Sequence, residues 1–468
     1  MKKIIAGFLA LLMLFPLLMN GQTKDGSVTD DVLKEVRKQF ANEPKASALM
    51  NAISNNKIKD LALNRSLAGK IDHYFSYRVK SKGITNQKSS GRCWLFTGLN
   101  VFRPTAIAKL GINEFEFSQN YNFFWDQFEK SNLFLEGIIA TSNKPLTDRT
   151  VEWLLKNPIG DGGQWTTFAD VVTKYGLVPS SVMPETKHTE NTGELTSLLS
   201  STLRTYGMSL RAKVKSNQPI PFADLRVEKV KMLSDIYRIL SYCLGEPPTT
   251  FTWRYKDSTD KIVNAGIFTP QSFYQTIIGV NLKDYVMFMN DPSRDFYKLY
   301  EIQYDRNMAD GSNWHYINLP TDDLKELAKK SIMNNEALYF SCDVGKQLNS
   351  TAGILNVGQY QPDQLFSIKL NMDKKQRIQT NESSSSHGMA LIGVDTDKDG
   401  KPINWLLENS WGAESGHNGY LTMTDKWFDE YMFRLVVNKK YIPAEIMKIL
   451  DKEAILLPPW DPMFSPEQ

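Results

Sequence analysis

The stretch that decides the fold is Asn86–Phe96, with the sequence NQKSSGRCWLF. It joins an irregular segment, Ser89–Arg92, to an apolar helical pattern that begins at a cysteine, Cys93. A thiol at the start of a helix lies near the positive end of the helix dipole, which stabilises the thiolate and lowers the pKa of the thiol. Because the thiolate is the nucleophilic form, the stretch predicts a reactive cysteine.

The reactivity of Cys93 depends on partners elsewhere in the chain, because an isolated cysteine is more often a small buried apolar residue. One partner is close in sequence. Gln87 precedes Cys93 by six residues, and its side-chain amide is a candidate donor to an oxyanion that forms beside the thiol. In the helix that follows Cys93, Pro104 is expected to introduce a kink or an early end.

Two later stretches carry a histidine and an asparagine. His387 stands at the head of an apolar strand pattern, Ser386–Val394, and Asn409 stands near the end of a second one, Trp405–Gly412. The polar segment Asp395–Lys401 between them is typical of a turn that joins two adjacent antiparallel strands. A histidine on a strand or an asparagine in a turn is usually structural, so neither residue is informative alone.

The order Cys93, His387, Asn409 matches the papain-type arrangement of a cysteine nucleophile. In that arrangement the histidine takes the proton of the thiol and the asparagine orients the imidazole. Together with the spacing between Gln87 and Cys93, the combination is specific enough to predict acyl transfer. An inactive binding protein that kept the fold remains an alternative, although none of the four residues is missing.

These stretches resemble the bleomycin hydrolase / aminopeptidase C family of papain-like cysteine peptidases. The resemblance covers most of the chain after the leader, and it implies an α+β, two-lobed fold with a helical lobe, an antiparallel β lobe, a large helical insertion and two terminal arms. It also implies an aminopeptidase that acts on peptide substrates without a cofactor. The further similar segments are Ser118–Asp126, Asp161–Trp165, Phe251–Asp257, Cys342–Lys346 and Leu457–Met463.

The resemblance also assigns substrate contacts. Gly162 and Gly163 are expected to line the extended backbone of the substrate, although an ordinary turn explains a glycine pair equally well. Trp411 is expected to pack over the hydrogen bond between His387 and Asn409. The α-carboxylate of Gln468, at the end of a C-terminal arm lying in the cleft, is expected to pair with the free amine of the substrate.

The C-terminal arm, 454–468, contains four prolines, so it is neither a helix nor a central strand. Its large apolar residues, Leu456, Leu457, Trp460 and Met463, predict docking rather than fraying. The ending Phe464–Gln468 differs from the small apolar ending that is typical of the family. The alternative is therefore an endopeptidase or a dipeptide-releasing enzyme with a displaced arm.

The separation of 294 residues between Cys93 and His387 exceeds the about 130–150 residues of a papain-type core. An insertion is therefore expected between them. The predicted segments are a signal peptide at 1–21, an N-terminal helical arm at 22–70, the helical lobe with the nucleophile at 71–193, the helical insertion at 194–248, the β lobe with His387 and Asn409 at 249–453, and the C-terminal arm at 454–468.

The leader has the pattern of a secretory signal peptide. Lys2 and Lys3 precede an apolar run, Ile4–Met19, which Pro16 interrupts and which is short for a membrane-spanning helix. We expect cleavage near Gly21, export to the periplasm or the medium, and no stable membrane association afterwards. The alternative is the cytoplasm, where most of the family is found.

The composition is that of a globular protein with a sizeable core, with 41% hydrophobic and 23% charged residues among 468. A net charge of +3 is too mild to indicate nucleic acid as a partner, and the basic residues of 211–231 fit a solvated helix face better. Three cysteines and five histidines show no disulfide framework and no metal-binding spacing. The family resemblance implies a homo-oligomer, a hexameric ring; a nucleic-acid-binding oligomer with secondary peptidase activity is the rival reading.

Overall fold

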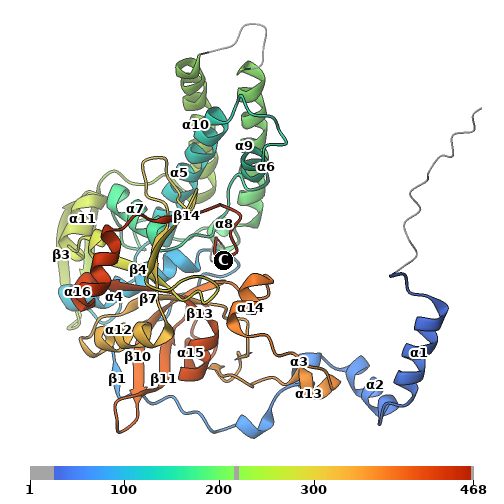
Figure 1. Ribbon diagram of the computed structural model, residues 1–468. Helices are drawn as coiled ribbons and strands as arrows, with labels where there is room; N and C mark the ends of the chain where they lie inside the picture. Colours follow the sequence, from blue (N-terminus) through green and yellow to red (C-terminus); the bar gives the residue numbers. More distant parts are fainter. Residues whose placement is uncertain (1–25, 215–220, 465–468) are drawn as a thin grey trace, which may run out of the picture. The chain divides into compact units, whose positions relative to one another are not determined.

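The computed structural model describes residues 26–214 and 221–464, so the predicted signal peptide and Gln468 lie outside the described residues. The chain divides into two compact units, Met1–Ala62 and Leu63–Gln468 (Figure 1). The further segment boundaries expected from the sequence remain predictions. In the first unit the described helices are α1 (Asp30–Ala41), α2 (Ala46–Asn55) and α3 (Ile58–Leu61), and none of them has a buried residue.

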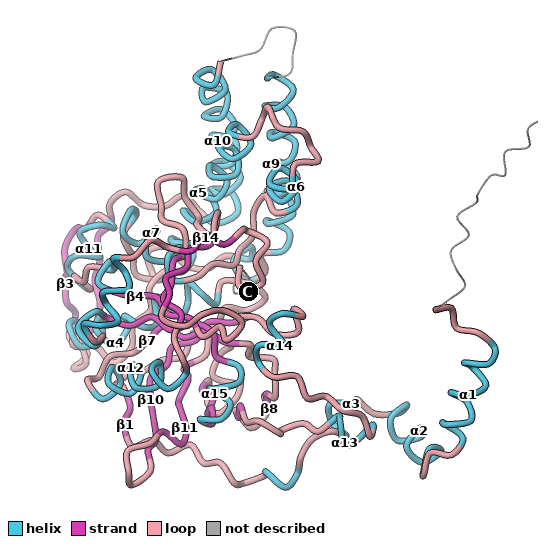
Figure 2. The backbone as a smooth tube through the Cα atoms, viewed as in Figure 1, coloured by secondary structure: helices cyan, strands magenta, loops and turns pink. Residues whose placement is uncertain are grey.

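A twelve-stranded mixed sheet runs through the second unit (Figure 2). Its strands follow the order β14-β5-β6-β4-β13-β7-β10-β11-β12-β9-β8, and β1 pairs with β10. Most neighbours are antiparallel, whereas β4–β6, β9–β12 and β5–β14 are parallel. The strands are β1 (Tyr77–Arg78), β4 (Tyr285–Met289), β5 (Lys298–Ile302), β6 (His315–Asn318), β7 (Leu338–Cys342), β8 (Leu348–Asn349), β9 (Ile354–Leu355), β10 (His387–Thr396), β11 (Pro402–Glu408), β12 (Tyr420–Thr424), β13 (Met432–Asn438) and β14 (Ile455–Leu457).

The central strands β7, β10 and β13 are buried along most of their length. Their almost continuous apolar sequences fit this position, because a strand that is covered on both faces has no solvent side to alternate with. The predicted antiparallel pair is present: β10 and β11 flank the polar turn, and Ala390 lies opposite Glu408. A separate two-stranded sheet consists of β2 (Phe251–Lys256) and β3 (Ile262–Phe268).

Helix α4 (Cys93–Leu110) contacts β7 and β10. Of the two expectations for Pro104, an early end of the helix is wrong, since the helix continues to Leu110, and a kink stays a prediction. Tertiary packing explains why: every residue of Cys93–Arg103 is buried, and a Cβ atom on Gly98 would lie 2.5 Å from the ring of Phe168. The remaining helices are α5 (Gln119–Ala140), α6 (Arg149–Lys156), α7 (Trp165–Tyr175), α8 (Lys187–Glu190), α9 (Gly193–Val214), α10 (Phe222–Leu244), α11 (Pro270–Ile277), α12 (Thr321–Met333), α13 (Pro362–Phe366), α14 (Lys374–Gln379), α15 (Asp425–Tyr431) and α16 (Ala444–Met447).

Helices α9 and α10 lie beside α5 and extend away from the sheet (Figure 1). The cations singled out in this region bond within the chain rather than forming an open basic surface, apart from Lys215, which lies outside the described residues. Arg226 and Lys229 pair with Glu136, Lys213 and Lys231 pair with Glu228, and Arg211 donates to the carbonyls of Thr141 and Lys144.

A buried ion pair connects α4 to β11. Arg103 Nη2 lies 2.6 Å from Glu408 Oε1, and the two side chains are 2% and 1% exposed. Arg103 also donates to the carbonyl of Gly83, and Ser81 Oγ donates to Glu408 Oε2. Burial raises the pKa of Glu408, so the carboxylate depends on these partners for its charge.

We predict that Arg103→Leu lowers the free energy of unfolding by about 3–5 kcal/mol, because it leaves a buried carboxylate unpaired. Urea unfolding at neutral pH measures this loss. Since burial raises the pKa of Glu408, the folded variant takes up a proton there as the pH falls. The difference from the unmodified protein therefore shrinks toward acidic pH.

The matched control is Lys156→Met, which removes an exposed pair with Glu152 whose side chains are 71% and 53% exposed. Its effect should stay within about 1 kcal/mol. Equal losses in the two variants, or a loss for Arg103→Leu that does not depend on pH, would contradict the interpretation of the buried pair.

Candidate active site

Cys93 is the first residue of α4, and its thiol is fully buried. The backbone N–H of Gly388 donates to Cys93 Sγ at 3.5 Å. Gly388 is the second residue of β10, so this contact brings the head of the strand, and with it His387, to the start of the helix. Both the helix dipole and this N–H group favour negative charge on the sulfur.

His387 and Asn409 are also buried, at 2% and 1% exposure, and His387 Nε2 lies 2.8 Å from Asn409 Oδ1. The backbone N–H of Ser410 donates to the same Oδ1 atom at 2.8 Å. A backbone N–H only donates, so the Asn409 atom at this point is the oxygen, and Nε2 of the imidazole must carry a proton. The tautomer set in this way makes Nδ1 the nitrogen that exchanges a proton with the thiol.

Trp411 covers this pair. Its ring centroid lies 4.8 Å from that of His387, and the two ring planes are inclined by 32°. The indole therefore lies against the imidazole as the sequence predicts. Asn409 Nδ2 is buried without a hydrogen-bond partner in the described part of the chain, so the side-chain amide of Asn409 is held through its oxygen alone.

Gln87 is held at both ends of its amide. Its Oε1 accepts a hydrogen bond from Ser410 Oγ at 2.7 Å, and its Nε2 donates to the carbonyl of Ser90 at 2.7 Å. A carbonyl only accepts, so the amide orientation is fixed. One N–H of Nε2 is used in this way, and the second is left for a ligand, consistent with the predicted oxyanion donor.

Backbone pairing joins the segment before Cys93 to the segment after Asn409. Gln87 N donates to Ser410 O at 2.8 Å, and Gly412 N donates to Thr85 O at 3.0 Å. Asn86 and Trp411 form an isolated antiparallel bridge. Two stretches more than three hundred residues apart in sequence are thus fixed in register with one another.

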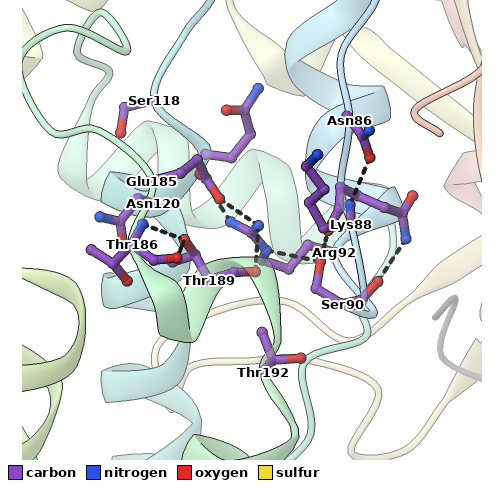
Figure 3. Close-up of polar contacts among 12 residues, drawn as sticks. Asn86, Lys88, Ser90, Arg92, Ser118, Asn120, Glu185, Thr186, Thr189 and Thr192 are labelled. Atoms are coloured by element: carbon purple, nitrogen blue, oxygen red, sulfur yellow. Dashed lines mark hydrogen bonds and ion pairs between the residues drawn. The ribbon is translucent and has the colours of Figure 1, made fainter. Parts of the chain in front are cut away.

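Arg92, which immediately precedes Cys93, is the centre of a polar network (Figure 3). Its side chain is fully buried and forms two bonds to Glu185, at 3.1 and 2.6 Å. Arg92 also donates to the carbonyl of Thr189 at 2.8 Å and to Ser90 Oγ at 3.1 Å. A planar guanidinium with this many acceptors holds the loop before the thiol in one conformation.

The loop with the two predicted glycines lies beside the loop that precedes Cys93. The Asp161 carboxylate accepts from Gly91 N at 2.7 Å, and Trp94 Nε1 donates to the Asp161 carbonyl at 2.8 Å. A Cβ atom on Gly163 would lie 2.7 Å from the ring of Trp94. Gly162 and Gly163 line a cavity of about 610 Å³.

The C-terminal arm lines the same cavity, through Pro459–Pro462 and Phe464. After β14, which pairs with β5, Met463 is fully buried and its carbonyl accepts from Arg434 at 2.9 Å. Arg294 forms an ion pair with Asp461, and the ring of Phe464 meets that of Trp153 edge-on. The arm is therefore docked through Phe464, although Leu456 is 58% exposed and does not contribute as expected.

Sequence reasoning missed the residues that hold the predicted ones in place. Arg92 and Arg103 read as ordinary charged positions, and nothing in a single sequence pairs them with Glu185 and Glu408. The available signal was their position, since charged residues within an apolar helical pattern require buried partners.

The described residues contain neither a metal-binding cluster nor a helix that could span a membrane. In residues 26–214 and 221–464, no group of three or more histidine, cysteine or acidic side chains is arranged to hold a metal ion. No helix in these ranges is long and apolar enough to cross a membrane. Cys93, Cys243 and Cys342 form no disulfide bond.

Comparison with known proteins places the chain in a family. Residues 27–464 match the Peptidase C1-like family. Human bleomycin hydrolase is 39% identical over 432 residues, covering 90% of this chain and 94% of that protein. Aminopeptidase C from Listeria innocua is 37% identical over 440 residues, covering 94% and 98%. The crystal structure of PepW from Lactobacillus rhamnosis has a TM-score of 0.90 and 39% identity, covering 94% of this chain and 100% of that one. The chain therefore belongs to the Peptidase C1-like family and is an enzyme with a papain-like α+β fold, a cysteine peptidase.

Proposed function

We propose that this protein is an aminopeptidase that removes N-terminal residues from peptides by acyl transfer to Cys93. The observation that carries the proposal is the constellation at the start of α4. The Cys93 thiol accepts from the backbone N–H of Gly388, the residue after His387, and the imidazole of His387 bonds the amide oxygen of Asn409; all three side chains are buried. These residue types in this geometry constitute a thiol nucleophile, its base and the group that orients the base.

The reaction follows from the atoms present. His387 Nδ1 takes the proton of the Cys93 thiol, and the sulfur attacks the carbonyl carbon of the first peptide bond. The tetrahedral oxyanion accepts from Gln87 Nε2 and from the backbone N–H of Cys93. His387 then gives its proton to the leaving amine, and a thioester remains. Water, deprotonated by His387, hydrolyses the thioester and releases the N-terminal residue.

The C-terminal arm supports exopeptidase action. Its docked residues, up to Phe464, line the cavity that Gly162 and Gly163 also line, so the arm fills part of the space next to the glycine loop. An arm in that place obstructs a substrate that extends further toward its own N-terminus. The relatives named aminopeptidase C and bleomycin hydrolase agree with this reading. An endopeptidase or dipeptide-releasing enzyme with a displaced arm is the second candidate, because the ending Phe464–Gln468 is atypical.

We predict that the mature protein cleaves aminoacyl fluorogenic substrates with a free α-amine and leaves their N-acetylated counterparts intact. The assay is performed in reducing buffer. Cys93→Ala should abolish the activity, because no other group supplies the nucleophile. Comparable cleavage of both substrates would favour the endopeptidase, and activity in Cys93→Ala would refute the mechanism.

The variant Gln87→Ala separates the oxyanion donor from the nucleophile in the same assay. Loss of one such donor should lower kcat about a hundredfold or more. Alkylation of Cys93 by iodoacetamide forms no oxyanion and should continue at an unchanged rate. A parallel loss of alkylation would show that Gln87 acts on the thiol rather than on the oxyanion.

The role proposed for the α-carboxylate of Gln468 is tested by a chain that ends at Phe464. Its carboxylate no longer reaches the same place, so kcat/KM for the free-amine substrate should fall about tenfold, the usual range for a charge-assisted hydrogen bond. Cleavage of the N-acetylated substrate should rise.

The control for this truncation is Gln468→Ala, which keeps both the length of the chain and its terminal carboxylate. It should behave as the unmodified protein does. If the chain ending at Phe464 keeps the original preference for the free amine, then the terminal carboxylate does not select the substrate.

We further propose that the protein is exported and assembles with copies of itself. Export rests on the leader sequence. Assembly is supported by α1, in which Val32, Val36 and Phe40 recur at helical spacing and are exposed at 49%, 52% and 55%. An apolar stripe of this kind on a helix without buried residues fits a surface that another chain covers.

One experiment tests both parts of this proposal. The full-length chain is produced in a bacterial host and the exported fraction is analysed by mass spectrometry and sedimentation. We expect a mature chain that begins near Gln22 and sediments as an assembly, whereas Val36→Glu/Phe40→Glu sediments as smaller species. A retained leader would contradict export with cleavage, and identical sedimentation of the two proteins would contradict the role of α1.

A further inference from the structure

The loop that carries Gly162 and Gly163 is held by its carbonyl groups. Three successive carbonyls accept side-chain hydrogen bonds. Gly160 O accepts from Gln127 Nε2 at 3.0 Å and from Lys130 Nζ at 3.1 Å. Asp161 O accepts from the indole of Trp94, and Gly162 O accepts from Lys130 Nζ at 2.6 Å. Lys130 thus donates to the carbonyls of Gly160 and Gly162, the two neighbours of Asp161.

The third acceptor of the Lys130 ammonium is a buried carboxylate. Lys130 Nζ lies 2.7 Å from Asp126 Oδ2, one turn earlier on α5, and Asp126 is fully buried. Asn307 donates to the other carboxylate oxygen of Asp126 at 3.0 Å. The ammonium has three N–H groups and three acceptors around it, so its position is set by charge-assisted hydrogen bonds in every direction.

This arrangement lies against Trp94, the residue that follows the nucleophile. Lys130 Nζ is 5.5 Å from the centre of the Trp94 ring, and Trp94 is the neighbour of Cys93 in the chain. The same indole packs against Gly163. The glycine loop borders the cavity and also bonds the loop before the thiol, so a peptide that reaches Cys93 from the cavity passes beside this wall.

The ion pair with Asp126 on the same helix would need only one of the three N–H groups of Lys130. The other two N–H groups of Lys130 donate to carbonyls of the loop that lines the cavity. Lys130 also lines this cavity itself. With those carbonyls turned toward α5, the loop presents the glycine edge to the cleft in a fixed conformation. A loop fixed before the substrate arrives binds it without a further loss of conformational entropy.

We propose that Lys130 is a positioning residue for peptide binding, because its ammonium fixes the Gly160–Gly163 loop as the wall of the cleft beside Cys93. This inference rests on the proposed peptidase function of the same site. Lys130 does not touch the reacting atoms. Its loss should therefore weaken the binding of peptides while leaving the chemistry of the Cys93 thiol intact.

The test compares Lys130→Met with Lys229→Met. Methionine keeps the length of the side chain and removes all three N–H groups. Lys229 is a matched control, since its side chain is 13% exposed against 14% for Lys130 and it also bonds a carboxylate, that of Glu136. Lys229 lies on α10 and does not line the cavity.

Three quantities are measured on each protein: kcat and KM for the free-amine aminoacyl substrate, the rate of Cys93 alkylation by iodoacetamide, and the temperature of unfolding. For Lys130→Met we expect KM to rise about tenfold with kcat changed by less than about threefold, the pattern of lost substrate binding. The alkylation rate should not change, because iodoacetamide is too small to need the glycine loop. Lys229→Met should match the unmodified protein in KM and alkylation.

An unchanged KM in a folded Lys130→Met protein would overturn the inference, and so would a fall of the alkylation rate in parallel with activity. If Lys130→Met does not fold, the double variant Asp126→Asn/Lys130→Met replaces it, because this variant buries no unpaired charge. Its KM and its alkylation rate are then judged by the same criteria. If the unmodified protein and Lys229→Met are both inactive on the substrate, the proposed function fails, which is distinct from failure of the Lys130 inference.

Discussion

Two buried arginines hold the helix that carries the nucleophile, one at each side of its buried half. Arg92 precedes Cys93 and bonds Glu185 of the helical part of the unit, whereas Arg103 bonds Glu408 at the end of β11. An arginine buried among apolar residues is tolerated only when carboxylates and carbonyls satisfy its N–H groups. The buried half of α4 is thus tied at one end to the helical part of the unit and at the other to the sheet.

The chemistry depends on this constraint. Asn409 directly follows Glu408, so the ion pair of Arg103 with Glu408 also fixes where the asparagine emerges from the sheet. His387 starts the neighbouring strand and bonds Asn409, and Gly388 next to it donates to the thiol. The amide oxygen of Asn409 and both ends of the Gln87 amide are held by fixed hydrogen-bond partners. The site is therefore organised before a substrate arrives, which is the condition for electrostatic stabilisation of a transition state.

Hydrogen bonds also fix the wall of the cavity, but there the backbone of the loop supplies acceptors instead of donors. At the thiol, the backbone N–H of Gly388 donates to the sulfur, whereas in the Gly160–Gly163 loop the carbonyls bond Lys130, Gln127 and Trp94. The C-terminal arm then occupies part of the remaining space, held by the ion pair of Asp461 with Arg294. Because burial raises the pKa of Asp461, its charge depends on that arginine.

The sequence by itself determined the local parts of this protein. The start of a helix at Cys93, the strands that begin at His387 and end before Asn409, and the turn between those strands all follow from short patterns of apolar residues, glycine and polar turn residues. The order of Cys93, His387 and Asn409 with Gln87 upstream predicts the chemistry. These features are readable because each depends on residues close together in the chain.

Only the tertiary structure decided which distant groups meet. Pro104 lies inside α4 rather than at its end, because the packing of the buried residues on both sides outweighs the loss of one helical hydrogen bond. Lys130, Arg92 and Arg103 carry no local signal of their partners, since those partners are carbonyls and carboxylates from other elements. A single sequence specifies a donor but not its acceptor, and the acceptor is fixed by the packing of the sheet and helices as a whole.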